Sequence, residues 1–260
     1  MKWNGAVAVI TGASRGIGRE VTLAAARRGA RVGLLARSTS ELDAVLAEAG
    51  GQGAVATADI GVREEVEAAL AALTAELGPI DILVNNAGAG SWSAVADTDV
   101  EVYERLMRLN YLGTVYATKA VLPSMLDRGR GHIVNVGSIA GRIGAPFEAA
   151  YSASKFAVSG FTECLAVEVH SRGVGVSMVN PGPVQTDFFD ARGVPYARKT
   201  PKPVPASDVA DAVIAAVEKD RLEQFVPRFL GGASRMRALL PGQVYRWGSA
   251  KAFKDELGTR

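Results

Sequence analysis

The stretch TGASRGIG, residues 11–18, directly follows the apolar run AVAVI at residues 6–10. Its glycines, Gly12, Gly16 and Gly18, fall where the chain must bend before a helical pattern begins at residue 17. Glycine is needed at such a bend because a Cβ atom would block the tight turn. The stretch therefore predicts a strand, a tight turn and a helix.

The same alternation of strand and helix continues along the chain. Further β-rich runs occupy residues 31–36, 53–58, 80–86, 131–138, 173–181 and 223–227. Helical patterns occupy residues 17–28, 40–48, 63–77, 100–128, 151–171 and 207–218. Strands that read as continuous apolar runs and are separated by such helices imply a parallel sheet covered on both faces. We therefore expect an α/β protein with one doubly wound Rossmann-type domain over residues 1–230 and about seven strands.

The composition excludes several classes of protein. A net charge of +2 over 260 residues is too small for a typical nucleic-acid-binding domain, so a small-molecule partner is expected. No apolar run approaches the roughly 18 residues of a membrane span, and no signal peptide is evident, so a cytoplasmic location is expected. The single cysteine, Cys164, lies in the apolar run FTECLAVEV and is expected to be a buried thiol without chemistry. No metal site is expected.

The glycine turn has the strand and helix context of a dinucleotide-binding site, although its spacing is G-x3-G-x-G. Tight packing of strand against helix is the alternative reading of the glycines alone. After the second strand, where a carboxylate would bind a ribose 2′-hydroxyl, the chain has Arg37 and Ser38, and Arg15 lies within the turn. Two guanidinium groups and no carboxylate suit a 2′-phosphate, which predicts NADP(H) over NAD(H).

Polar or small residues follow the other strands and are expected to line the same cleft, because ligands bind at the carboxyl ends of parallel strands. The expected cofactor-binding residues are Gly12, Ser14, Arg15, Gly16, Ile17, Gly18, Arg37, Ser38, Asp59, Ile60, Asn86, Ala87, Gly88, Tyr151, Lys155, Pro181, Gly182, Val184 and Thr186.

The segment YSASK, residues 151–155, places Tyr151 and Lys155 on one face of a helix. A nearby ammonium group is expected to lower the pKa of the phenol and prepare it for proton exchange with an alcohol or carbonyl. Ser138, at a strand end, would hold the reacting oxygen against Tyr151. Asn110 suits a helix interior poorly, and a bound water linking it to Lys155 would explain its presence.

These ordered motifs, with NNAG at 85–88 and NPGPVQT at 180–186, resemble those of the short-chain dehydrogenase/reductase family over roughly residues 5–230. The resemblance implies a catalytic tetrad of Asn110, Ser138, Tyr151 and Lys155, and a homodimer or homotetramer built through the helices that hold Asn110 and Tyr151. It also implies that Arg15 and Arg37 mark an NADP-preferring member. Tyr151 would protonate a carbonyl oxygen that receives hydride from NADPH, and the reverse reaction would use the same groups.

The expected substrate is a hydrophobic ketone, aldehyde or secondary alcohol. The predicted pocket comprises Ser138, Phe147, Tyr151, Val184, Phe188, Phe189 and Tyr196. Residues 187–206 are expected to form a substrate loop, with a plain surface loop as the alternative. Reduction of a 3-oxoacyl thioester is the second reading, in which Arg128 and Arg130 meet an acidic carrier protein. A nicotinamide-binding regulator without catalysis is the third.

The segment 231–260 is expected to be a basic, amphipathic extension. From Arg221 to Arg260 there are eight Lys or Arg residues against three Asp or Glu residues. Met236 and Leu239 lie at helical spacing beside arginines, and Tyr245, Trp247 and Phe253 follow. Such a segment suits peripheral membrane contact, a partner protein, an acidic carrier, or packing on its own subunit or a neighbouring one.

Overall fold

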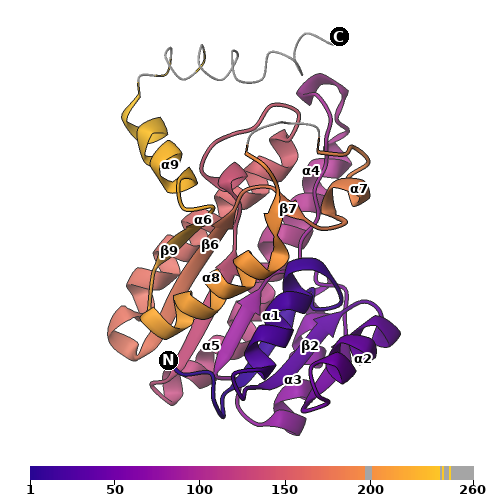
Figure 1. Cartoon of the computed structure of the whole chain (residues 1–260), viewed down its shortest axis with the longest axis vertical. Helices are drawn as coiled ribbons and strands as arrows, with labels where there is room; N and C mark the ends of the chain where they lie inside the picture. Colours follow the sequence, from indigo (N-terminus) through magenta and orange to yellow (C-terminus); the bar gives the residue numbers. More distant parts are fainter. Residues whose placement is uncertain (197–200, 241, 243–245, 247–260) are drawn as a thin grey trace.

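The computed structural model describes residues 1–196, 201–240, 242 and 246, and one parallel sheet lies at its centre (Figure 1). The main elements are β1 (Val7–Thr11), α1 (Gly16–Ala26), β2 (Arg31–Ala36), α2 (Thr39–Glu48), β3 (Gly53–Thr57), α3 (Arg63–Leu77), β4 (Ile82–Asn85), α4 (Val100–Leu106), α5 (Gly113–Asp127), β5 (Gly131–Val136), α6 (Ala149–Val169), β6 (Val174–Pro181), α8 (Ala206–Lys219), β9 (Glu223–Val226) and α9 (Leu230–Leu239).

The central sheet has seven strands in the order β3-β2-β1-β4-β5-β6-β9. Every neighbouring pair is parallel, with Val9 opposite Gly33 of β2 and Leu83 of β4. The order runs outward in both directions from the β1–β4 pair, so the carboxyl ends of β1 and β4 border the crevice of a doubly wound sheet. The prediction of an α/β doubly wound fold with about seven strands is confirmed.

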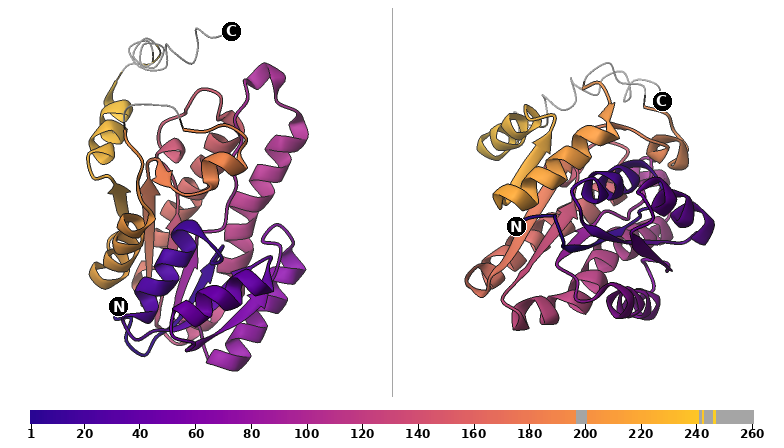
Figure 2. Two further views of the ribbon diagram at one scale, coloured as in Figure 1. Left: turned by 45° about the vertical axis from the view of Figure 1, so that its right-hand side comes forward. Right: turned by 60° about the horizontal axis from the view of Figure 1, so that its bottom comes forward.

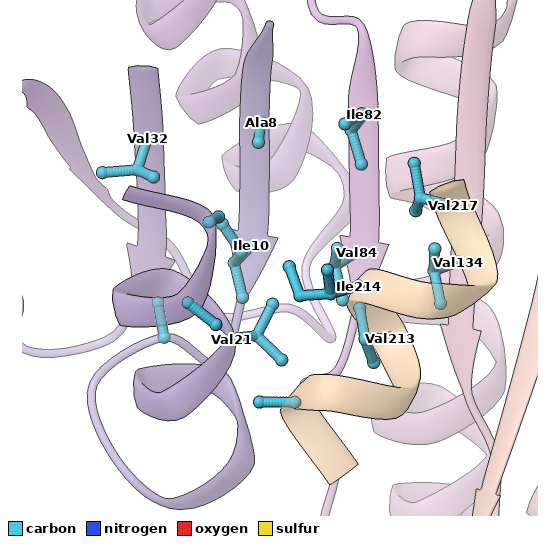
Figure 3. Close-up of a cluster of buried hydrophobic side chains, with 14 of the residues drawn as sticks. Ala8, Ile10, Val21, Val32, Ile82, Val84, Val134, Val213, Ile214 and Val217 are labelled. Carbon is cyan, nitrogen blue, oxygen red and sulfur yellow. The ribbon is translucent and has the colours of Figure 1, made fainter. Parts of the chain in front are cut away.

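Helices cover both faces of the sheet and create two hydrophobic cores (Figure 2). On one face, α1 contributes Val21 and α8 contributes Val213 and Ile214, which pack over Ile10 and Val84 of the strands (Figure 3). On the other face, α3, α5 and α6 supply the second cluster of buried side chains. Because both faces are buried, the strands carry apolar residues without alternation.

The long helix expected over residues 100–128 is interrupted in the middle. Residues Met107–Leu112 form a π-helix between α4 and α5. An inserted π turn widens a helix by one residue, and such turns are frequent at functional sites. Asn110 lies within this π-helix and is completely buried.

The substrate loop expected at residues 187–206 contains regular structure at both ends. The short helix α7 (Phe188–Ala191) follows β7 (Val184–Gln185), and β7 pairs in parallel with β8 (Val204–Pro205). Residues 197–200, in the middle of this loop, lie outside the described residues.

At the carboxyl end, α9 begins at Leu230, which is buried, while Met236 and Leu239 are exposed. The predicted contributions of Tyr245, Trp247 and Phe253 lie outside the described residues. In the described part of the chain, the helices are too short or too polar to span a bilayer.

The prediction that Cys164 is buried is wrong, because its side chain lies on the exposed face of α6. Val167 and Phe156 on the same helix are also exposed, at 81% and 45%. The apolar run around Cys164 therefore extends over both the buried and the exposed face of the helix. Within it, residues such as Thr162 and Leu165 point into the core.

Candidate active site

The glycine turn between β1 and α1 has the conformation that its sequence predicts. Gly12 and Gly16 have φ angles of +64° and +54°, a region that side chains with a Cβ atom rarely adopt. A Cβ on Gly18 would lie 2.1 Å from the carbonyl oxygen of Gly12 and 2.6 Å from Nδ2 of Asn86. Each glycine therefore has a steric reason of its own.

The amino terminus of α1 suits a phosphate group. Arg15 is the N-cap residue, and its side chain makes no capping hydrogen bond. The first N–H groups of a helix have no partner within the helix, and together with the helix dipole they attract anions. This uncapped helix start beside a glycine-rich turn fits the pyrophosphate of a dinucleotide.

Thr11 and Asn86 hold the glycine turn in place. The Thr11 hydroxyl accepts hydrogen bonds from the backbone N–H groups of Asn86 and Ala87, both at 3.0 Å. The Asn86 side chain donates to the carbonyl oxygens of Thr11 and Gly12 at 3.0 and 3.2 Å. The amide of Asn86 thus joins the segment after β4 to the turn, and its contact with a cofactor stays a prediction. The role of Thr11 was not predicted from the sequence.

The three residues predicted for the 2′-phosphate lie near the carboxyl ends of β1 and β2. Arg37, directly after β2, is exposed, and Arg15 is an exposed side chain 4.0 Å from the carboxylate of Asp187. The hydroxyl of Ser38 accepts from the N–H of Glu41 at 3.4 Å and so caps α2. Both arginine side chains are therefore exposed after neighbouring strands, whereas the Ser38 hydroxyl already caps α2.

The other predicted cofactor residues follow the strands as expected. Asp59 accepts from the N–H of Gly61 at 2.8 Å, which fixes the turn after β3. A Cβ on Gly88 would lie 3.0 Å from Oδ1 of Asn110 and 3.6 Å from Nζ of Lys155. Thr186 lies beside the glycine turn, since its Cγ2 is 3.1 Å from the place of a Cβ on Gly16. The remaining predicted positions are Ser14, Ile17, Ile60, Ala87, Pro181, Gly182 and Val184.

Tyr151, Ser138 and Lys155 meet beyond the ends of β4 and β5. Lys155 is 5% exposed, and its ammonium donates to the carbonyl oxygen of Val136 at 2.9 Å and lies 6.0 Å from the centre of the Tyr151 ring. Ser138 lies close enough to the Tyr151 phenol to lower its pKa, and the Ser138 hydroxyl also accepts from the N–H of Ala140 at 3.1 Å. Two hydroxyl groups and an ammonium therefore converge.

The expected lowering of the tyrosine pKa is wrong for the protein by itself. Burial raises the pKa of Tyr151 well above its usual value, Glu148 adds to this effect, and Ser138 and Arg192 oppose it. Burial also lowers the pKa of Lys155 to about 8. Desolvation disfavours the charged form of both groups and outweighs the attraction between them at this separation.

The side chain of Asn110 makes direct contacts with two neighbouring segments, and its water-mediated link to Lys155 stays a prediction. Its side-chain oxygen accepts from the N–H of Ala89 at 2.8 Å, and its amide donates to the carbonyl of Ala89 at 2.9 Å and to the hydroxyl of Ser154 at 2.8 Å. Its side chain therefore ties the segment after β4 to α6, the helix that carries Tyr151.

Aromatic rings extend outward from Tyr151. The ring of Phe188 lies 5.4 Å from that of Tyr151, Phe189 lies 5.7 Å from Phe188, and Tyr196 lies 5.0 Å from Phe189. Phe147 stacks on Trp92 at 5.5 Å. Val184 is instead a member of the buried cluster under α8. The structure thus brings together most of the predicted pocket and adds Trp92, Glu148 and Arg192, which carried no motif in the sequence.

Arg128 and Arg130 lie away from this site. Arg128 donates to the Asp81 carboxylate at 2.8 Å, and Arg130 lies 3.3 Å from the same group. Asp81 precedes β4 and Arg130 precedes β5, so both arginines occupy the amino-terminal edge of the sheet. The candidate catalytic residues occupy the opposite edge.

Comparisons with known proteins agree with this geometry. The model of a family described as short chain dehydrogenase matches residues 6–194. Dehydrogenase/reductase SDR family member 7B of Mus musculus is 36% identical, covering 96% of this chain and 82% of that protein. The 3-oxoacyl-[acyl-carrier-protein] reductase FabG of Vibrio cholerae is 39% identical over 81% of this chain and 86% of its own length.

Two solved structures are similar throughout. A short chain dehydrogenase/reductase from Burkholderia phymatum in complex with NAD has a TM-score of 0.84 and 25% identity, with 92% of this chain and 94% of that chain covered. A variant of actinorhodin polyketide ketoreductase with NADPH has a TM-score of 0.80 and 33% identity, with 89% of this chain and 99% of that chain covered.

Proposed function

The chain belongs to the short-chain dehydrogenase family, and on that premise we propose that it is an NADP(H)-dependent oxidoreductase that interconverts a hydrophobic ketone or aldehyde and its alcohol. The observation that carries the proposal is the meeting of Ser138, Tyr151 and Lys155 beside an aromatic pocket and an uncapped helix start.

A dinucleotide would be held by the turn at Gly12–Gly18, with its nicotinamide ribose near Lys155, and would supply or accept the hydride. For reduction, Tyr151 donates its phenolic proton to the carbonyl oxygen, and Ser138 donates a hydrogen bond that orients the same oxygen. In the oxidation direction Tyr151 takes the proton of the alcohol. The ammonium of Lys155 stabilises the phenolate formed in reduction and so eases its reprotonation.

Asn110 supports this arrangement indirectly. Its side chain holds Ala89 and Ser154, and the Ser154 hydroxyl in turn donates to the backbone carbonyl of Tyr151. Asn110, Ser138, Tyr151 and Lys155 are therefore our proposed tetrad. The raised pKa of Tyr151 in the protein by itself suits a group that must carry its proton until a substrate oxygen arrives.

The preference for NADP(H) is proposed from Arg15 and Arg37, two exposed arginines that follow β1 and β2, and from the lack of a carboxylate directly after β2. Arginine binds a phosphate through paired charge-assisted hydrogen bonds. The similar structures hold NAD in one case and NADPH in the other, so the arginines are the argument for the preference.

Reduction of a 3-oxoacyl thioester is the second candidate, favoured by the 39% identity to FabG of Vibrio cholerae and the likeness to a polyketide ketoreductase. The position of Arg128 and Arg130 opposes the carrier docking expected for them, because they lie at the far edge of the sheet and are ion-paired with Asp81. A regulator without catalysis is disfavoured by the complete tetrad.

The remaining proposals concern context. We propose a cytoplasmic homodimer or homotetramer formed through α4, α5 and α6, because α6 exposes Phe156 and Val167. Residues 1–230 would form the nucleotide-binding and catalytic domain, with the basic segment from residue 231 as an extension available for peripheral membrane or partner contact.

The direct experiment is an assay of nicotinamide absorbance with a panel of carbonyls: alkyl and aryl ketones, aldehydes, free sugars, and a 3-oxoacyl thioester with and without carrier protein. We expect NADPH oxidation with apolar ketones or aldehydes and a lower rate with NADH. Activity confined to the carrier-bound thioester would favour the second candidate. Nucleotide binding without turnover of any carbonyl or alcohol would contradict enzymatic function.

A further inference from the structure

Arg192 occupies an unusual environment for a cation. Its guanidinium lies 4.5 Å from the centre of the Trp92 ring and 4.6 Å from that of Phe189, and its side chain is only 3% exposed. It forms an ion pair with Glu148, whose side chain is 14% exposed, and its Nε donates to the carbonyl of Val194 at 3.1 Å. Stacking, charge and hydrogen bonding are thus combined in one side chain.

These contacts join three segments that are distant in the sequence. Trp92 belongs to the segment after β4, Glu148 is the N-cap residue of α6, and Arg192 follows α7. The first two segments are also joined directly, because the N–H of Ser93 donates to the carbonyl of Phe147 at 2.8 Å. Trp92 and Ser93 on one segment, and Phe147 and Glu148 on the other, therefore form a wall of the site. Arg192 attaches the segment 188–196 to this wall.

The wall itself holds a strained residue. Phe147, directly before Glu148, has a φ angle of +63°, which bulky residues seldom adopt. Such a conformation persists only where the surrounding contacts determine it, and it occurs most often near functional sites. Here the backbone bond from Ser93 and the ring of Trp92 hold Phe147, so Glu148 is presented to Arg192 from a fixed position.

The attachment has a consequence at the candidate catalytic tyrosine. Phe188, four residues before Arg192, packs against Tyr151 on one side and against Gly90 on the other. A Cβ on Gly90 would lie 2.6 Å from the Phe188 ring, so the ring occupies space that only glycine leaves free. The N–H of Arg192 donates to the carbonyl of Phe188 at 3.1 Å, so the anchored arginine and the ring beside Tyr151 belong to the same helical turn.

We propose that Arg192, paired with Glu148, is a positioning residue that determines substrate specificity: it holds segment 188–196 closed, so that Phe188 forms one wall of the pocket beside Tyr151. This inference rests on the proposed function for its kinetic consequence, but the closed segment is a property of the protein by itself. Removing one partner would leave the other charge buried and unpaired, and opening of the segment to water would relieve that cost.

The two partners also act on Tyr151 electrostatically. Glu148 raises the pKa of Tyr151, whereas Ser138 and Arg192 lower it, and Lys155 is the other charged group beside the ring. Loss of either partner opens the segment, but loss of Arg192 removes a positive charge and loss of Glu148 a negative one. The two variants should therefore agree in their effect on substrate binding, while the pKa of Tyr151 should be higher in the variant that lacks Arg192 than in the one that lacks Glu148.

The kinetic test compares Arg192→Met and Glu148→Gln with wild type on a bulky apolar ketone and on a short aldehyde too small to reach Phe188. We expect KM for the ketone to rise roughly 10-fold or more in both variants, with a smaller change in kcat and little change for the aldehyde. The pKa of Tyr151, read from the pH dependence of kcat, should be higher in Arg192→Met than in Glu148→Gln. Arg192→Lys keeps the charge but not the planar stack, so its KM for the ketone should lie between those of wild type and Arg192→Met.

Arg128→Met is the matched control, because it removes an arginine from a partly buried pair with Asp81 at the opposite edge of the sheet. It should lower stability without raising KM for the ketone. An unchanged KM in both Arg192→Met and Glu148→Gln, or an equal rise in Arg128→Met, would overturn the proposal.

A second measurement is independent of activity. Chymotrypsin cleaves after aromatic residues, and segment 188–196 contains Phe188, Phe189 and Tyr196. Cleavage within this segment, identified by mass spectrometry, should be about 10-fold faster in Glu148→Gln than in wild type or Arg128→Met, since opening exposes the backbone. Equal rates would overturn the proposal even if no substrate were found, whereas faster cleavage without carbonyl turnover would leave it standing and refute only the proposed function.

Discussion

The side-chain amide of Asn110 donates to the hydroxyl of Ser154 at 2.8 Å, and that hydroxyl donates to the backbone carbonyl of Tyr151 at 2.7 Å. The π-helix thus reaches the backbone of the candidate catalytic tyrosine through one hydroxyl group. Because the widened turn is where Asn110 points inward, the irregularity in the helix and the position of Tyr151 are parts of one arrangement.

Asn110→Ala should therefore damage both stability and rate. The variant leaves both backbone polar groups of Ala89 without their buried partner, at a cost of about 2–4 kcal/mol in the free energy of unfolding. Ser154→Ala keeps the bonds to Ala89 and should cost about 1 kcal/mol. Urea unfolding and kcat measure the two effects. Equal losses in the two variants would contradict the role given to the Ala89 contacts.

Tyr151→Phe removes the phenolic proton and keeps the ring against Phe188. We expect the rate to fall by about 10² to 10⁴, because a positioned general acid contributes roughly that factor. NADPH affinity, measured by fluorescence titration, should change little. Turnover close to that of wild type would remove Tyr151 from the mechanism.

Arg37→Asp tests the preference for the phosphorylated nucleotide. The exposed guanidinium follows β2, and a carboxylate there would repel a 2′-phosphate while accepting hydrogen bonds from a ribose 2′-hydroxyl. The ratio of kcat/KM for NADPH to that for NADH should fall at least about 10-fold. Arg31→Asp, at the other end of the same strand and also exposed, is the control. An unchanged ratio in Arg37→Asp would contradict the preference.

The buried His132 should make the free energy of unfolding depend on pH. It is buried in β5, with its ring 2.8 Å from the Ser177 hydroxyl, and burial lowers its pKa from 6.5 to about 4 in spite of Asp220. The unfolded chain therefore binds the proton more readily between these values, so stability is complete above pH 6.5 and falls as pH decreases toward 4, by about 3 kcal/mol from this residue. His132→Asn should flatten the curve of unfolding free energy against pH, while the exposed His170→Asn should not.

The parts predicted best from the sequence are those that depend on local pattern. The doubly wound parallel sheet follows from continuous apolar strands joined by helices, and the glycine turn follows from Gly12 and Gly16, whose positive φ angles no other residue suits as well. Tyr151 and Lys155 meet because residues four apart share a helix face.

The parts that were missed depend on tertiary packing. The partner of Arg192 is 44 residues away, so no spacing in the sequence reveals the pair. The direction in which the pKa of Tyr151 shifts depends mainly on burial of the phenol. Proximity to Lys155, which is visible in the sequence, does not determine that burial. The apolar run around Cys164 indicated a core, but α6 also carries apolar side chains outward.

The exposure of Cys164 gives the chain a single chemical handle, since it is the one cysteine in the sequence and lies on the helix that carries Tyr151. If two chains pack along the outer face of α6, a maleimide dye should label this thiol slowly at high protein concentration and rapidly on dilution. Labelling that is equally fast at all concentrations would place any association of subunits elsewhere on the surface. The residue with no role in the chemistry is thus a direct reporter of assembly.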